Sequence, residues 1–122
     1  MDIQTQNKLI SEFMGYTYHK SKHSYDKSLF GEGFWSKPGC KMADLIFDHD
    51  WNELIPVVEK IESLAIDNVG EIGIWIEPIR CLIGSDYHHP IIEVAVDMCH
   101  SKIEMIYKAV IQFIQWYNNQ NK

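Results

Sequence analysis

The sequence predicts an α+β fold in which an antiparallel sheet of three to four strands packs with three helices in a sandwich-like arrangement. Three segments carry apolar residues at helical spacing, and the shorter runs between them alternate apolar and polar residues as strands do. Short turns join neighbouring strands, which favours antiparallel pairing. The expected order is α-β-β-α-β-β-α. A length of 122 residues with 46% apolar content fits a single domain over residues 1–122.

The first helix is expected from Thr5 to Met14, and Gly15 follows at the position of a left-handed C-terminal cap. Alternation over 16–19 predicts a short strand. The polar, glycine-rich stretch 21–39 then reads as a long loop, so that the segment 16–41 forms a basic, aromatic-rich excursion from the domain.

A second strand is expected at 43–47, followed by an amphipathic helix over 51–65. Either Asp48 or Asp50 is suited to accept hydrogen bonds from the free amides of its first turn. Pro56 lies inside this pattern and removes one backbone hydrogen bond, which predicts a bend in the helix.

The stretch from 72 to 83 alternates regularly and is interrupted at Pro78. This pattern predicts two strand segments, 72–76 and 79–83, separated by a bulge or a break. A connection of hairpin length follows, and 91–98 is expected to return as another strand.

The chain ends in a predicted helix whose start is marked by a capping box of Ser101 and Glu104. Its core-facing stripe comprises Ile103, Ile106, Tyr107, Val110, Ile114 and Tyr117. Met105, Ala109 and Trp116 form a second apolar stripe, which predicts a contact with a partner, most simply another copy of the chain in a homo-oligomer.

Charge is distributed unevenly along the chain. The net charge is −6, which argues against a surface that binds duplex DNA. Residues 16–41 hold five lysines against Asp26 and Glu32, so this segment carries +3 and the rest of the chain −9. The segment is therefore chemically distinct.

Three cysteines, Cys40, Cys81 and Cys99, form no Cys-x-x-Cys pair and fit neither a disulfide framework nor a zinc ribbon. The sequence also contains no apolar run long enough for a membrane span and no signal-peptide pattern at the N-terminus. We therefore expect a cytoplasmic protein without membrane association.

Aromatic and basic side chains interleave in the segment 16–41. The candidate ligand-binding residues are Tyr16, Tyr18, His19, Lys20, Lys22, His23, Tyr25, Lys27 and Trp35. Stacking surfaces beside cations suit a single-stranded nucleic acid or a nucleotide-like ligand. The simpler interpretation is a solvated loop whose aromatic side chains fold back onto the sheet.

The tripeptide Asp48, His49 and Asp50 contains a general base beside an orienting carboxylate, as in a small hydrolase or nuclease. Helix capping explains at least one aspartate without any chemistry. The sequence has no nucleophile elbow, Walker loop or dinucleotide motif. We therefore assign no catalytic residue and no cofactor.

The nearest approach to a metal site in the sequence is His88 and His89 beside Asp86, with Cys81 and Cys99 on the flanking strands. Adjacent strand residues point to opposite faces, so both histidines cannot readily serve one ion. A polar hairpin turn with small buried cysteines explains the pattern, and we predict no metal.

Three segments carry a resemblance to known proteins: KLISEFMG at 8–15, WNELIPVVEKIE at 51–62 and KIEMIYKAVIQFIQWYN at 102–118. Together they resemble small uncharacterised proteins of phages and prophages of gut anaerobes and, more loosely, the phage αβα-sandwich domain family. The resemblance implies a helix–sheet–helix sandwich of viral origin and a place in the host cytoplasm. It implies no activity.

Binding rather than catalysis is the function that these observations favour. We expect a phage-type accessory protein that self-associates and contacts a host protein or a small ligand. The alternative is a small nucleotide or single-stranded nucleic-acid binder that uses 16–41, and a small enzyme built on Asp48, His49 and Asp50 comes third.

Overall fold

The computed structural model describes residues 2–21, 33–39, 41–43, 45–66 and 69–120. It is an α+β protein with three α-helices and small antiparallel sheets, as the sequence predicts. Contacts divide the chain into two compact units, 1–45 and 46–122. Each is described by itself, and one domain over 1–122 stays a prediction.

Unit 1 begins with helix α1 (Ile3–Phe13), close to the expected bounds. The carboxylate of Asp2 caps it by accepting a hydrogen bond from the Thr5 amide at 2.7 Å. Gly15 follows with a φ of +78°, the left-handed conformation that the sequence predicts for this position. Inside the unit, the Asn7 side chain donates to the carbonyl oxygen of Leu45 at 2.8 Å, which ties the helix to the end of the unit.

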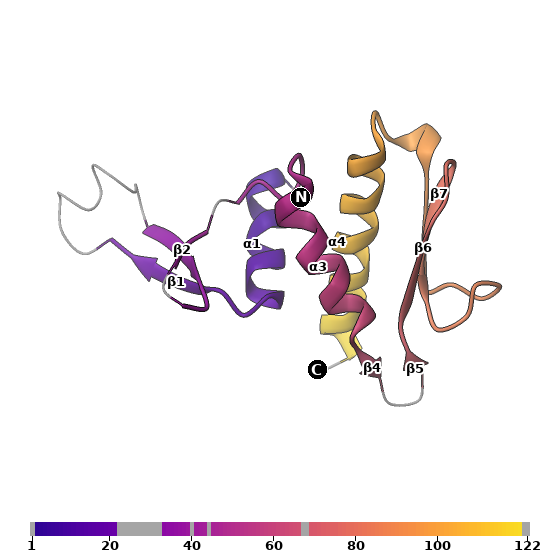
Figure 1. Ribbon diagram of the computed structural model, residues 1–122, viewed down its shortest axis with the longest axis horizontal. Coiled ribbons are helices and arrows are strands. Elements are labelled where there is room, and N and C mark those ends of the chain that lie inside the picture. The colour runs from indigo at the N-terminus through magenta and orange to yellow at the C-terminus, as the bar shows by residue number, and fades with distance from the viewer. Residues whose placement is uncertain (1, 22–32, 40, 44, 67–68, 121–122) are drawn as a thin grey trace. The chain divides into compact units, whose positions relative to one another are not determined.

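The rest of unit 1 is a three-stranded antiparallel sheet in the order β1-β2-β3 (Figure 1). Its strands are β1 (Thr17–Lys20), β2 (Gly33–Lys37) and β3 (Lys41–Met42). The loop predicted over 21–39 is therefore wrong at 33–37, which pairs with β1; residues 22–32 lie outside the described part of the chain.

The strand predicted at 43–47 is also wrong at 43 and 45–47, and residue 44 lies outside the described residues. The third strand lies earlier, because Gly39 with a φ of +92° allows a tight turn that pairs Lys37 with Lys41. Phe47, which supplied part of the strand pattern, is instead a fully buried residue of a turn.

Unit 2 begins with helix α3 (Trp51–Glu62), shorter than the predicted 51–65. Asp50 is its N-cap and accepts a hydrogen bond from the Asn52 amide at 2.8 Å, so capping explains this aspartate. A small hairpin of β4 (Ala65–Ile66) and β5 (Gly70–Glu71) leads to the central sheet.

The central sheet has the antiparallel order β6-β7-β8. Its strands are β6 (Gly73–Ile76), β7 (Arg80–Gly84) and β8 (Ile92–Ala95). Pro78 marks a chain reversal between two paired strands rather than a bulge, since the Glu77 amide donates to the Arg80 carbonyl across the turn. The strand predicted over 91–98 stops at Ala95, where the short helix η1 (Val96–Met98) begins.

Helix α4 (Lys102–Gln120) packs against β7 and β8 and contacts α3. One half of the predicted capping box is present, because the Ser101 hydroxyl accepts from the Glu104 amide at 3.2 Å; the Glu104 carboxylate accepts from the His100 amide at 2.7 Å instead of from Ser101. Figure 1 shows α4 on one side of β6 and β7, with the chain between β7 and β8 projecting on the other side. The fully buried side chains of this core include Leu54, Ile61, Cys81, Ile83, Ile106, Val110, Phe113 and Ile114.

Two residues of the predicted interface stripe belong to the interior. Met105 and Ala109 are both 0% exposed, because α4 is buried on more than one side, whereas the stripe was expected to lie on the surface. Trp116 is half-buried, with its ring 5.7 Å from that of Phe113. Self-association stays a prediction, and of the three stripe residues only Trp116 is partly accessible in this structure.

Candidate functional site

The sheet of unit 1 leaves its side chains accessible. All four residues of β1 are exposed, and all five residues of β2 are half-buried. A sheet in a soluble protein ordinarily buries at least one apolar face. The aromatic side chains that the sequence places here are therefore available to a ligand or a partner.

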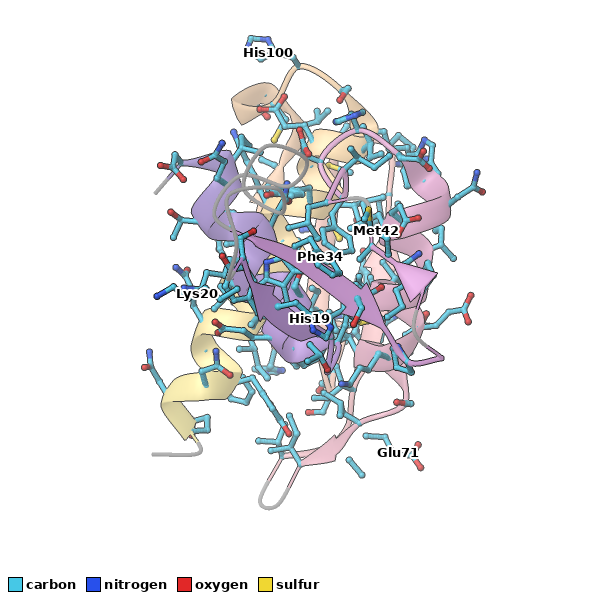
Figure 2. The ribbon with its side chains drawn as sticks, turned by 90° about the vertical axis from the view of Figure 1, so that its left-hand side faces the viewer. His19, Lys20, Phe34, Met42, Glu71 and His100 are labelled. Carbon is cyan, nitrogen blue, oxygen red and sulfur yellow. The ribbon has the colours of Figure 1, made fainter. Side chains whose placement is uncertain are left out.

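Pairing of the strands sorts these side chains onto two faces. Thr17 lies opposite Ser36, and His19 opposite Phe34, so these four residues share one face; Met42, opposite Ser36 on β3, joins them. We call this set the His19 face. Figure 2 shows His19 and Phe34 on the two long strands, with Lys20 and Met42 toward opposite edges.

The side chains of the His19 face contact one another across the strands. The rings of His19 and Phe34 are stacked, with centroids 4.9 Å apart and planes 21° from parallel. The Nε2 atom of His19 lies 2.8 Å from the Ser36 hydroxyl, within hydrogen-bond distance. Stacking and hydrogen bonding together hold the imidazole in one orientation.

A hollow of about 410 Å³ opens on this face. Its lining combines an aromatic ring, hydroxyl groups and the turn after β2, and consists of Thr17, His19, Phe34, Ser36, Lys37, Pro38 and Gly39. An apolar wall with a few convergent polar groups is the usual composition of a small-ligand site. The hollow lies wholly within unit 1.

The opposite face of this sheet carries Tyr18 and Trp35, which are directly paired. Their ring centroids are 5.2 Å apart with planes at 50°. The Tyr18 ring also lies across Gly33, where an added Cβ would come within 2.6 Å of its Cζ atom. Only a glycine leaves room for the phenol here. We call this the Tyr18 face.

The predicted ligand residues are thus partly brought together. Tyr18, His19, Lys20 and Trp35 lie on one small sheet, whereas Tyr16 precedes it and donates its amide to the Ser11 carbonyl. Lys22, His23, Tyr25 and Lys27 lie outside the described residues. Ser36 and Met42 were missed; alternation along Phe34, Trp35 and Ser36 is the signal that places Ser36 beside Phe34.

The side chains of Asp48, His49 and Asp50 do not form a buried, hydrogen-bonded catalytic site. His49 is 64% exposed, and its Nδ1 atom lies 3.2 Å from the Asp48 carboxylate. Asp50 caps α3 as described. Burial raises the pKa of the Tyr107 phenol, and the negative charge of Asp48 raises it further. The charge of Asp48 is therefore felt by Tyr107 of α4 as well as by His49.

The histidines and cysteines of the candidate metal site make separate contacts and do not converge on one point. Asp86 accepts from the His88 amide at 2.9 Å and lies 3.5 Å from the His89 ring. Cys81 is fully buried in β7, and burial raises its pKa to about 11. Over 2–21, 33–39, 41–43, 45–66 and 69–120, no three metal-binding side chains converge. The absence of a metal stays a prediction.

A second polar cluster, which the sequence analysis missed, lies on the central sheet. Arg80 donates to Glu77 at 2.6 Å and to the Tyr87 hydroxyl at 2.9 Å, while that hydroxyl donates to Glu77 at 2.7 Å. Arg80 also lies 3.6 Å from Glu93. Since every member already has a partner within the cluster, its geometry indicates a structural role.

This cluster fixes the chain between β7 and β8 to the sheet. The Tyr87 ring meets Trp75 edge-on at 5.8 Å, on the side of the sheet that carries Leu82. Hydrogen bonds from the Tyr87 hydroxyl and, second, from Arg80 hold the pKa of the Glu77 carboxyl below its usual value. The same contacts, led by Glu77, raise the pKa of the Arg80 guanidinium.

Comparison with known proteins adds no relative. No protein-family model matches the chain, and neither do curated proteins or solved structures. Among the described residues, no helix has the length and apolar character needed to cross a membrane. The resemblance to phage proteins therefore stays a prediction, and function is argued from the site.

Proposed function

We propose that the protein acts by binding, and that its ligand is a single-stranded nucleic acid held by the sheet β1-β2-β3. The observation that carries this proposal is a sheet whose two long strands bury none of their side chains and stack the rings of His19 and Phe34 on the face that holds the hollow. Flat rings offer every base a stacking partner, whatever the sequence.

Charge supports a single strand over a duplex. The segment 16–41, which contains the sheet, carries +3 within a protein of net charge −6, so the excess of positive charge is confined to one stretch of the sequence. A duplex-binding surface needs many phosphate contacts, whereas stacking supplies much of the affinity for unpaired bases. Exposed Lys20, at the end of β1, provides one cation at the edge of the sheet (Figure 2).

This use of the sheet has more support than the two rival functions. Two of the three residues expected to mediate self-association through α4, Met105 and Ala109, are fully buried and not accessible to a second copy. A hydrolase at 48–50 has one aspartate engaged as a helix cap and a histidine with a single carboxylate neighbour.

The test is fluorescence anisotropy of a labelled single-stranded oligonucleotide of about 10 nucleotides. We expect saturable binding that weakens with salt, and a much weaker response with the duplex of the same sequence. Lys20→Ala should reduce the salt slope by about 0.7, the value for one phosphate contact on a single strand. Lys102→Ala, an exposed lysine of unit 2, is the matched control and should leave the slope unchanged. Equal binding of duplex, or no binding of either, contradicts the proposal.

A further inference from the structure

The hollow on the His19 face has the size and lining for one base of such a strand. Resting on the proposed function, we infer that it binds a single nucleobase, which stacks on Phe34 while Ser36 and Thr17 hydrogen-bond to the base edge. The Tyr18 face takes no part in this recognition.

Size limits the occupant. Sites for small ligands have volumes of about 300–1,000 Å³, and the hollow of about 410 Å³ lies near the lower end. One nucleotide-sized group fits this space, whereas a folded protein segment or a stack of several bases does not. The remainder of the strand then lies outside the hollow.

The lining offers both interactions that a base requires. The stacked rings of His19 and Phe34 make one extended aromatic surface. A serine hydroxyl has one donor and two acceptor sites, so Ser36 keeps hydrogen-bonding capacity beyond its contact with His19 at 2.8 Å. Thr17 brings a second hydroxyl from the neighbouring strand to the same hollow. Hydroxyl groups that both donate and accept suit the mixed donors and acceptors of a base edge.

On the Tyr18 face, the rings contact each other and the sheet backbone. Tyr18 lies across Gly33 and meets Trp35 at 5.2 Å, so the backbone and the indole cover part of its ring, and the side chain is 46% exposed. The two hollows described in unit 1 are the one on the His19 face and a second along α1, lined by Thr5, Lys8, Leu9 and Glu12. Neither includes Tyr18 or Trp35. This asymmetry gives the inference a matched control.

The experiment compares Phe34→Ala and Ser36→Ala with Tyr18→Ala in the full chain, using the anisotropy assay and the same oligonucleotide. Phe34→Ala should weaken binding at least about fivefold, the lower range for loss of one base stack. Ser36→Ala should weaken it less but measurably, and it tests the same hollow with little risk to the fold. Tyr18→Ala should change affinity by less than about twofold. Circular dichroism of each variant checks that the sheet persists.

A chemical control separates base recognition from phosphate contacts. An oligonucleotide of the same length built from abasic units keeps the phosphates and removes every base. It should bind far more weakly to wild type, and Phe34→Ala should not weaken it further.

The outcomes separate this inference from the proposed function. If wild type binds the oligonucleotide but Phe34→Ala and Ser36→Ala bind as well as Tyr18→Ala, the inference is wrong and the proposed function stands. If the abasic strand binds as tightly as the natural one, the inference is also wrong. If wild type binds no single strand, both fail.

Discussion

The two three-stranded sheets differ in how far their side chains are buried. In β6-β7-β8, the residues Cys81 to Gly84 of β7 are all buried, since α4 lies against one face and Trp75 and Tyr87 lie on the other. In β1-β2-β3, β1 is exposed throughout and β2 has no buried residue. Both sheets are antiparallel, and β1 and β2 match β6 and β7 in length.

Strand pairing and side-chain burial are therefore separate properties of a sheet. The central sheet is stabilised by packing, so its side chains are committed to the core. The sheet of unit 1 pairs its backbone in the same way yet presents Tyr18, His19 and Phe34 to contacts outside the core. A binding function fits the accessible sheet of unit 1. Substitutions in the central sheet should therefore lower stability, whereas substitutions in the sheet of unit 1 should affect binding.

The largest expected effect is on stability in the central sheet. Leu82→Ala removes a side chain that is 1% exposed and should lower the free energy of unfolding by about 2–5 kcal/mol, because a cavity replaces its contacts. Thr17→Ala, on exposed β1, should change it by no more than about 0.5 kcal/mol. Urea unfolding followed by circular dichroism measures both, and equal losses would remove the distinction between the sheets.

A smaller effect is expected at the polar cluster of the central sheet. The folded-state pKa of Glu77 lies below its ordinary 4.5, so its contacts stabilise the fold above that value, and this contribution is lost as pH falls through the lowered pKa. Tyr87→Phe removes the leading cause, and the pKa of Glu77 should rise toward 4.5. Carboxyl titration by NMR measures this.

Tyr18→Phe is the control for that titration, since it removes a phenolic hydroxyl from the other sheet and should leave the pKa of Glu77 unchanged. A Glu77 titration curve that is the same in Tyr87→Phe and in wild type would show that the hydroxyl does not hold the carboxylate.

The helices could be predicted from sequence because their signals are local. Asp50 lies directly before α3, and Ser101 with Glu104 marks the start of α4, so capping and helical spacing agree within a few residues. The burial of Met105 could not be predicted, because a helical pattern shows that a residue is apolar but not how many sides of the helix are covered.

Strand pairings were harder to predict because they depend on distant residues. The run at Phe34 and Trp35 is too short to predict a strand by itself, and its place in a strand follows from pairing with β1. The contact of Tyr87 with Glu77 and Arg80 arises when the chain after β7 folds back onto the sheet, which no local pattern encodes. The aromatic and basic character of 16–41 was visible, but the shared face of His19, Phe34 and Ser36 needed the register.

Backbone amide NMR maps where a single-stranded oligonucleotide contacts the chain. We expect amide shifts to concentrate at 17–20 and 33–37, on the sheet whose side chains are accessible, while 73–76, 80–84 and 92–95 of the central sheet stay unchanged. Shifts centred on the central sheet or on α4, with β1 and β2 unaffected, would contradict the proposed function.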